Sequence, residues 1–200
     1  NTWRTLTKDE WDYLLNTRTN ASVLKGVAQV NGVNGLIFLP DTWVCPEGIT
    51  FKSGFHSSYG VDYYAVYQTF TAEQWSKLES AGAVFLPAAG FRYGSDVRGV
   101  QDAGYYWSAT EFNSNYAYFL NFFSDKAGVY DSNRYRGQSV RLVKDCFNEY
   151  RTNRNAVNYC ISECQNEDWF KAANISLEKQ LVTMVNSISL CNREVDNHVN

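Results

Sequence analysis

The sequence has few of the residues on which catalysis and nucleic-acid binding depend. Among its 200 residues only two are His, His56 and His198, and the formal net charge is -3. A Ser-His-Asp or Cys-His mechanism needs a positioned base, but His56 is expected in a loop and His198 lies close to the end. The chain also lacks the clustered Lys and Arg of a large nucleic-acid interface. We therefore expect a protein that is not an enzyme and does not bind nucleic acid.

Long apolar runs and early cysteines are also missing. No apolar stretch approaches the roughly 20 residues of a membrane-spanning helix. The chain begins at Asn1 instead of Met, and we read it as a mature or trimmed form. Cys45 is the only cysteine before residue 145, so the first part of the chain is expected to fold without disulfides. The remaining cysteines are Cys146, Cys160, Cys164 and Cys191. Their spacing includes no second close pair and no His cluster, so we expect neither a metal nor another cofactor.

Aromatic residues are plentiful, at 16% of the chain, and they accompany clear helix and strand signals. Thr7 with Glu10, and Thr71 with Gln74, fit capping boxes, which predict two short helices. Short apolar runs bounded by turn residues predict strands over 35–40, 83–87, 105–108, 117–123 and 139–143. Residues 92–101 are polar and turn-like, and we expect a solvated loop there. The open alternative is that Tyr93, Asp96, Arg98 and Gln101 border a recognition surface.

The segment YAYFLNFF, residues 116–123, carries aromatic side chains at both even-numbered and odd-numbered positions. Successive side chains of a strand point to opposite faces of a sheet. We therefore expect one face of this strand to meet the core and the other to meet a ligand or a partner.

The composition changes near residue 145. Beyond it the chain has no Gly and no Pro, and apolar residues recur at roughly helical intervals between 175 and 190. We predict a domain over residues 1–144 and a helical C-terminal tail over 145–200. The tail could pack on the domain or mediate self-association.

Five segments of the first 144 residues occur in a fixed order: WRTLTKDEWDYLLNTR, NGVNGLIFLPDTW, GAVFLPAAGFRYGS, GYYWSATE and GQSVRLVK. Together they resemble the FISUMP (major paralogous domain) family of bacterial surface and secreted proteins. The resemblance implies an α+β, C-type-lectin-like fold with two short helices and a small antiparallel sheet. It implies that the LPAAG, YWS and SVRLV segments, Trp107 included, are structural. It also implies a secreted or cell-surface protein, with a lipid anchor ahead of Asn1 and a phage tail as open alternatives.

The stretch from residue 112 to 138 is rich in Tyr, Asn, Ser, Asp and Arg, with one Lys and no Glu. Tyr supplies contact area at low entropic cost, and Asn and Ser supply adaptable hydrogen bonds, as in antibody paratopes. Similarity to the variable proteins of diversity-generating retroelements implies that this surface is diversified. We predict an adhesin or receptor-recognition face for a protein or glycan on a cell surface. The predicted contact residues are Tyr105, Phe112, Asn113, Asn115, Tyr116, Tyr118, Asn121, Phe123, Asp131, Asn133, Tyr135, Arg136 and Gln138.

Two other functions stay open at this point. One is a structural surface or fimbrial component without a specific ligand, which a buried aromatic cluster would favour. The other is a carbohydrate-active or formylglycine-generating-like enzyme, although the paired late cysteines of the latter are missing between Cys45 and Cys146. The Glu-Pro-Asn and Trp-Asn-Asp triplets typical of calcium-dependent sugar binding are also missing, so binding without a metal is expected.

Overall fold

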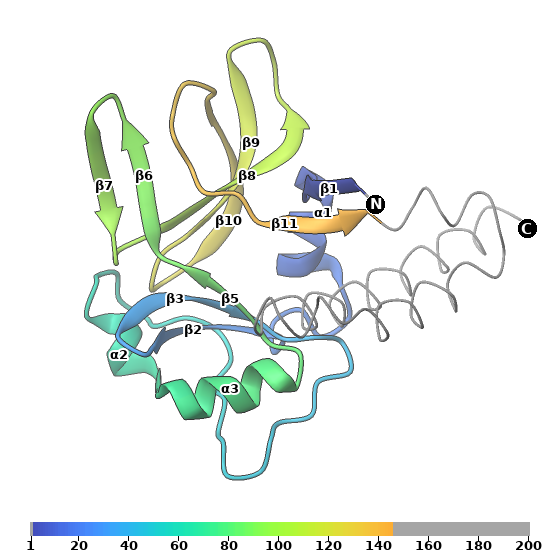
Figure 1. The fold of residues 1–200 in the computed structure, drawn as a ribbon, viewed down its shortest axis with the longest axis vertical. Coiled ribbons are helices and arrows are strands. Elements are labelled where there is room, and N and C mark those ends of the chain that lie inside the picture. The colour runs from blue at the N-terminus through green and yellow to red at the C-terminus, as the bar shows by residue number, and fades with distance from the viewer. Residues whose placement is uncertain (1, 146–200) are drawn as a thin grey trace, which may run out of the picture. The chain divides into compact units, whose positions relative to one another are not determined.

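The computed structural model describes residues 2–145 and divides the chain into two units. The larger unit is Thr5–Leu142, and it carries the elements discussed below (Figure 1). The other unit comprises Asn1–Arg4 and Val143–Asn200. Most of its described part is a two-stranded sheet of β1 (Thr2–Thr5) and β11 (Leu142–Asp145). The predicted helical tail over 145–200 lies outside the described residues.

The fold is mostly β, and the predicted α+β, C-type-lectin-like class with a small antiparallel sheet is wrong. Strands hold 41% and helices 17% of the described residues, and the larger sheet is a curled, five-stranded half-barrel. The reason lies in strands that are rich in turn-forming residues, such as DVRGV and AGVYDSN. These segments are extended because their backbone groups pair with neighbouring strands, and local propensity alone does not indicate this pairing.

The helices begin where the sequence predicts. Thr7 precedes α1 (Lys8–Asp12) and Thr71 precedes α3 (Ala72–Ser80), and both form complete capping boxes, so this prediction is confirmed. α1 continues directly into a π-helical turn, η1 (Tyr13–Thr17). A further short helix, α2 (Tyr63–Tyr67), was not predicted. Within the part of the chain that the structure describes, no helix combines the length and apolar character needed to cross a bilayer.

A four-stranded sheet has the order β4-β2-β3-β5. Its strands are β2 (Lys25–Val30), β3 (Val33–Phe38), β4 (Thr69–Phe70) and β5 (Val84–Pro87). β2 and β3 form a hairpin at Asn31 and Gly32, whose φ angles of 48° and 80° fit the tight turn that an Asn-Gly pair favours. Buried residues of β2, β3 and β4 pack with Leu78 of α3, which lies below this sheet in Figure 1.

The five-stranded sheet has the order β10-β9-β8-β6-β7. Its strands are β6 (Ala89–Tyr93), β7 (Asp96–Val100), β8 (Gly104–Glu111), β9 (Tyr116–Phe122) and β10 (Ala127–Asn133). β8, β9 and β10 are antiparallel, whereas β6 meets β8 at one parallel bridge, Gly90 with Gly104. Beyond this bridge residues 137–139 pair with both strands, Gly137 with Arg92 and Ser139 with Tyr106.

The strand predictions are confirmed in part. The predicted segments 35–40, 83–87, 105–108 and 117–123 overlap β3, β5, β8 and β9. The segment 139–143 forms a bridge at Ser139 and only then enters β11. Residues 92–101 are not a loop: they belong mainly to the β6–β7 hairpin, in which Arg92 pairs with Val97.

The core of the unit Thr5–Leu142 lies between the two sheets and the first helix. Trp11, Leu36 and Leu120 are each at most 1% exposed and belong to one buried cluster with residues of both sheets. Asn34 of β3 and Gln101, which follows β7, join the sheets by polar contacts. The Asn34 backbone N–H donates to Gln101 Oε1 at 2.7 Å, and Asn34 Nδ2 donates to the Gln101 carbonyl at 2.9 Å.

Candidate functional site

The two faces of the five-stranded sheet differ in what they contact. Tyr106, Leu120 and Phe122 belong to the buried core cluster. Tyr105 and Phe119 alternate with them along β8 and β9, so their side chains point to the opposite face. This second face is the one that the alternation in YAYFLNFF assigns to a ligand or partner.

Seven aromatic rings lie on this second face, from β6, β8, β9, β10 and the residue after β9. We call them the aromatic face: Phe91, Tyr93, Tyr105, Trp107, Phe119, Phe123 and Tyr130. Ring centres are 4.8 Å apart for Phe91 and Tyr105, 5.9 Å for Tyr105 and Phe119, and 6.3 Å for Phe119 and Tyr130. Phe119, in the middle, is 7% exposed, whereas Tyr130 is 49% and Tyr93 43% exposed. The face is therefore a continuous row of rings that is buried at Phe119 and exposed to solvent at Tyr93 and Tyr130.

Two glycines, Gly90 of β6 and Gly104 of β8, lie where neighbouring strands leave no room for a Cβ. Gly90 has φ +68°, and a Cβ there would collide with the carbonyl oxygen of Arg98. A Cβ at Gly104 would collide with the ring of Phe122. Gly90 and Gly104 are bridge partners, and Phe91 and Tyr105 directly follow them, so the two rings lie in contact.

Arginine and glutamine side chains border the aromatic face on the β6 side. The guanidinium Cζ of Arg136 lies 5.3 Å from the centre of the Phe91 ring and 6.0 Å from that of Tyr93. Arg98 lies 5.3 Å from the Tyr93 ring and also pairs with Asp96 at 3.1 Å. Both side-chain amide atoms of Gln138 are enclosed, and neither has a hydrogen-bond partner within the described part of the chain.

Tyr59 extends the aromatic face at its other end. Its ring centre lies 5.2 Å from that of Phe123, and its hydroxyl donates to Asp102 Oδ2 at 2.5 Å. This hydrogen bond to a carboxylate raises the pKa of Tyr59 to about 12. Burial raises the pKa of Tyr105, while Asn121 and Arg136 act in the opposite direction. Both phenols are therefore neutral hydrogen-bonding groups at physiological pH.

The structure separates the predicted contact residues into two groups. Tyr105 and Phe123 belong to the aromatic face, and Asn121, Arg136 and Gln138 lie on the same side by strand alternation. Tyr135 joins this group through its ring, 5.9 Å from that of Tyr93. Asn121 is only 8% exposed, because its Nδ2 donates to the Gly104 carbonyl at 3.0 Å.

The second group lies near the β8–β9 turn. Tyr116 and Tyr118 point to the same side of the sheet as the core residues of β9, because they lie an even number of positions from Leu120. The centre of the Phe112 ring lies 6.5 Å from that of Tyr116 and 5.4 Å from that of Tyr118. We call Phe112, Tyr116 and Tyr118 the hairpin patch. Asp131 and Asn133 of β10 pair with Tyr118 and Tyr116 and share their side of the sheet. Asn113 and Asn115 form the turn, where Asn113 Oδ1 accepts from the backbone N–H groups of Asn115 and Tyr116.

Sequence reasoning missed four members of the aromatic face, which are Phe91, Trp107, Phe119 and Tyr130. Tyr93 was named only as an open alternative. Trp107 was expected to be a core residue, but its ring packs on Phe119 at 6.0 Å, on the side away from the core. The overlooked signal was the alternation of side chains along β9. Leu120 and Phe122 belong to the core, so Phe119, which lies at an odd-numbered position next to Leu120, points to the opposite side.

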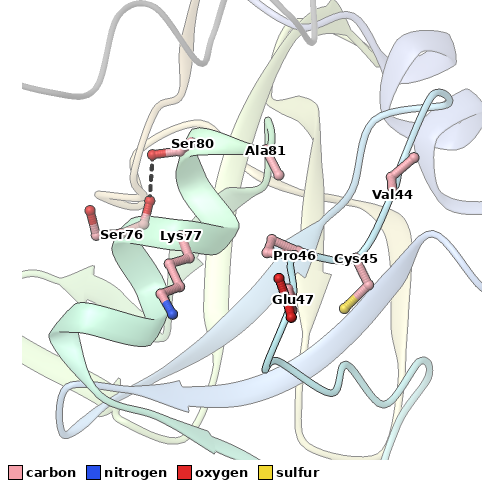
Figure 2. Close-up of a pocket in the computed structure, with 8 residues that line it drawn as sticks. All are labelled: Val44, Cys45, Pro46, Glu47, Ser76, Lys77, Ser80 and Ala81. Carbon is pink, nitrogen blue, oxygen red and sulfur yellow. Dashed lines mark hydrogen bonds between the residues drawn. The ribbon is translucent and has the colours of Figure 1, made fainter.

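A separate shallow hollow of about 580 Å³ lies between the loop at Cys45 and α3 (Figure 2). Cys45 and Glu47 line one wall and Lys77 the other, and no hydrogen bond or ion pair joins these three described residues. The Cys45 thiol instead lies 3.3 Å from the Ile49 carbonyl oxygen. The described residues also contain no group of three or more His, Cys, Asp or Glu that could hold a metal ion. The hollow therefore has neither a nucleophile–base pair nor a metal site.

Two family models match parts of the chain. Residues 66–143 match a domain of unknown function (DUF8237), and residues 129–200 match the GreA-associated C-terminal domain. No curated protein and no solved structure matches the chain. The first match spans the whole five-stranded sheet and with it the aromatic face, and the second begins within β10.

Proposed function

We propose that the unit Thr5–Leu142 is a ligand-binding domain, with an adhesin or receptor-recognition role, that meets its ligand through the aromatic face. One observation carries this proposal: a continuous row of rings lies on the side of the sheet that does not form the core. Tyr93 and Tyr130 expose the ends of this row to solvent, and exposed aromatic clusters of this kind are typical of interaction sites. Tyr and Trp are also the residue types that most often dominate binding energies.

The rigidity of the aromatic face supports the same proposal. Tyr105 and Phe119 stack at an interplanar angle of 19°, and their strands are hydrogen-bonded neighbours. Side chains held by each other and by a sheet lose little conformational entropy when a ligand binds. The surface is therefore prepared for binding before the ligand arrives.

Tyr135 lies at the rim of this surface, whereas the hairpin patch lies on the other side of the sheet. Phe112 is 50% exposed beside the half-buried Tyr116, and Tyr135 is 67% exposed beside Tyr93, which is itself exposed. We place retroelement-type diversification, if the locus has it, at such exposed positions. Sequences of many alleles would test it, and variation spread evenly over the core would contradict it.

A second candidate partner comes from the family match at residues 129–200. That domain is described as GreA-associated. We therefore include GreA as a protein partner beside cell-surface ligands, although the aromatic face favours neither by itself.

The test is a binding screen with the full chain against a glycan array, cell-surface protein extracts fractionated to purity, and GreA. Variant Tyr130→Ala removes the most exposed ring of the aromatic face, and Val66→Ala, at a still more exposed apolar position on α2, is the control. We expect Tyr130→Ala to weaken binding at least about tenfold, as for an aromatic hot spot, and Val66→Ala to have no effect. Equal binding by wild type and Tyr130→Ala would count against the proposal, provided both unfold at the same temperature.

A further inference from the structure

Arg136 is a cation of the aromatic face that has no counter-ion among the described residues. Its guanidinium lies over Phe91 and Tyr93, and its Nε is enclosed without a hydrogen-bond partner in this part of the chain. The other cations beside the aromatic face have carboxylates near them. Arg98 lies 3.1 Å from Asp96, and Lys126, which lies over the Phe123 ring, is 4.0 Å from Asp125.

Gln138 gives a second, independent sign of a missing partner beside Arg136. The extended segment from Arg136 to Gln138 pairs with β6 through Gly137 and Arg92, so Arg136 and Gln138 point to the same side. Both polar atoms of the Gln138 amide are enclosed and unbonded within the described residues. Buried polar groups in folded proteins nearly always have a hydrogen-bond partner, so the Arg136 Nε and the Gln138 amide are adjacent polar groups that a polar ligand or water would satisfy.

We infer that this end of the aromatic face binds an acidic oligosaccharide, with the Arg136 guanidinium paired to a sugar carboxylate. The inference rests on the proposed function and specifies its ligand. A planar guanidinium fork matches a carboxylate with two parallel hydrogen bonds. The Gln138 amide, once its side chain turns outward, both donates and accepts, as a sugar hydroxyl does. The neighbouring rings of Tyr93 and Tyr105 offer apolar surface to the sugar ring.

The fold favours a glycan over the other anionic ligands. An acidic peptide gains affinity by pairing its main chain with a free sheet edge, but Arg136 lies over the face of the sheet, where backbone groups are already paired. A nucleic acid needs several unpaired cations along its backbone, whereas the net charge of the chain is -3 and the neighbouring cations have carboxylate partners. One unneutralised guanidinium beside several rings fits a ligand with isolated carboxylates.

The experiment measures the affinity of the full chain for sialyllactose and a hyaluronan oligosaccharide, with lactose and a chitin oligosaccharide as neutral counterparts. A poly-glutamate peptide and oligothymidylate represent the other two classes. The variants are Arg136→Gln and Arg136→Lys. Arg134→Gln removes the same charge two residues away, where the side chain faces Glu111 at 3.7 Å, and serves as the control.

We expect wild type to bind an acidic sugar at least about tenfold more tightly than its neutral counterpart. Arg136→Gln should abolish this preference, Arg136→Lys should retain part of it, and Arg134→Gln should retain all of it. The inference is overturned if no acidic sugar binds, if Arg136→Gln keeps the preference, or if the peptide or the oligonucleotide binds as tightly as the sugar. In each of these cases the proposed function still stands if Tyr130→Ala weakens the binding of another ligand. It is contradicted if Tyr130→Ala weakens the binding of no ligand in the screen.

Discussion

The ring of Phe91 lies 4.8 Å from the ring of Tyr105, although their strands meet at a single bridge between Gly90 and Gly104. The contact lies directly beside these glycines, whose Cβ positions are occupied by the Arg98 carbonyl of β7 at Gly90 and by the Phe122 ring of β9 at Gly104. It joins the β6–β7 hairpin to the three antiparallel strands and makes the aromatic face continuous. The geometry of the proposed binding surface is thus linked to two positions that carry no side chain.

Gly104→Ala should destabilise the unit strongly, because the new methyl group would collide with the buried Phe122 ring. Overpacking of this kind costs about 1–3 kcal/mol. Gly94→Ala is the matched control: its φ of 59° is strained for Ala, but nothing lies within 4 Å of its Cβ position. Urea unfolding should show the larger loss for Gly104→Ala, and equal losses would mean that the ring of Phe122 can move aside.

Arg18→Met should cost about 3 kcal/mol or more in the free energy of unfolding. The Arg18 side chain is 3% exposed and donates to the carbonyls of Leu14, Leu24 and Leu39, and it also pairs with Asp41 at 3.2 Å. Removing it leaves three carbonyl oxygens without this donor. Arg134→Met, at an exposed ion pair, should cost under about 1 kcal/mol in the same urea titration. A similar small loss for Arg18→Met would show that water replaces the guanidinium.

Asn121 and Asn115 should respond differently to substitution, although both were predicted as contact residues. Asn121→Ala removes a buried donor to the Gly104 carbonyl and should cost about 1–3 kcal/mol. Asn115 is exposed in the β8–β9 turn, and Asn115→Ala should change stability by less than about 0.5 kcal/mol. Thermal unfolding distinguishes the two, and a neutral Asn121→Ala would return this position to the set of variable candidates.

Tyr59 should ionise near pH 12 instead of pH 10, because its hydroxyl donates to the Asp102 carboxylate. Between these values the unfolded chain loses the Tyr59 proton while the folded chain keeps it, so the stability contributed by this group is present below pH 10 and is lost as pH rises toward 12. The ultraviolet absorbance of tyrosinate measures the ionisation. Asp102→Asn should bring the transition back toward pH 10, and an unchanged transition would rule out Asp102 as the cause.

The sequence predicted those parts of the fold that have local signals. Thr7 with Glu10 and Thr71 with Gln74 satisfy backbone donors within one turn, so four residues suffice to locate each helix start. β3 and β5 are apolar runs and were found for the same reason. β7 and β10 were missed because their residues favour turns, and their extended form depends on partners distant in the chain.

The candidate site was predicted in position but not in composition. The region between Tyr105 and Gln138 does contain most of the aromatic face. The predicted contact residues, however, included side chains from both sides of β9. Tyr118 and Phe123 were assigned to one surface, although strand alternation places them on opposite sides. Phe91 could not be found locally and Tyr93 was only an open alternative, because the bridge between β6 and β8 brings them to the site.

Residues 137–139 fill the space between β6 and β8, which precede them by several dozen residues. During synthesis the inner edges of those two strands therefore emerge from the ribosome before the segment that pairs with them. Until Ser139 follows, these edges present free hydrogen-bonding groups to any extended chain nearby. Completion of the sheet, and with it of the surface that carries Arg136 and Gln138, is a late event in the biosynthesis of this protein.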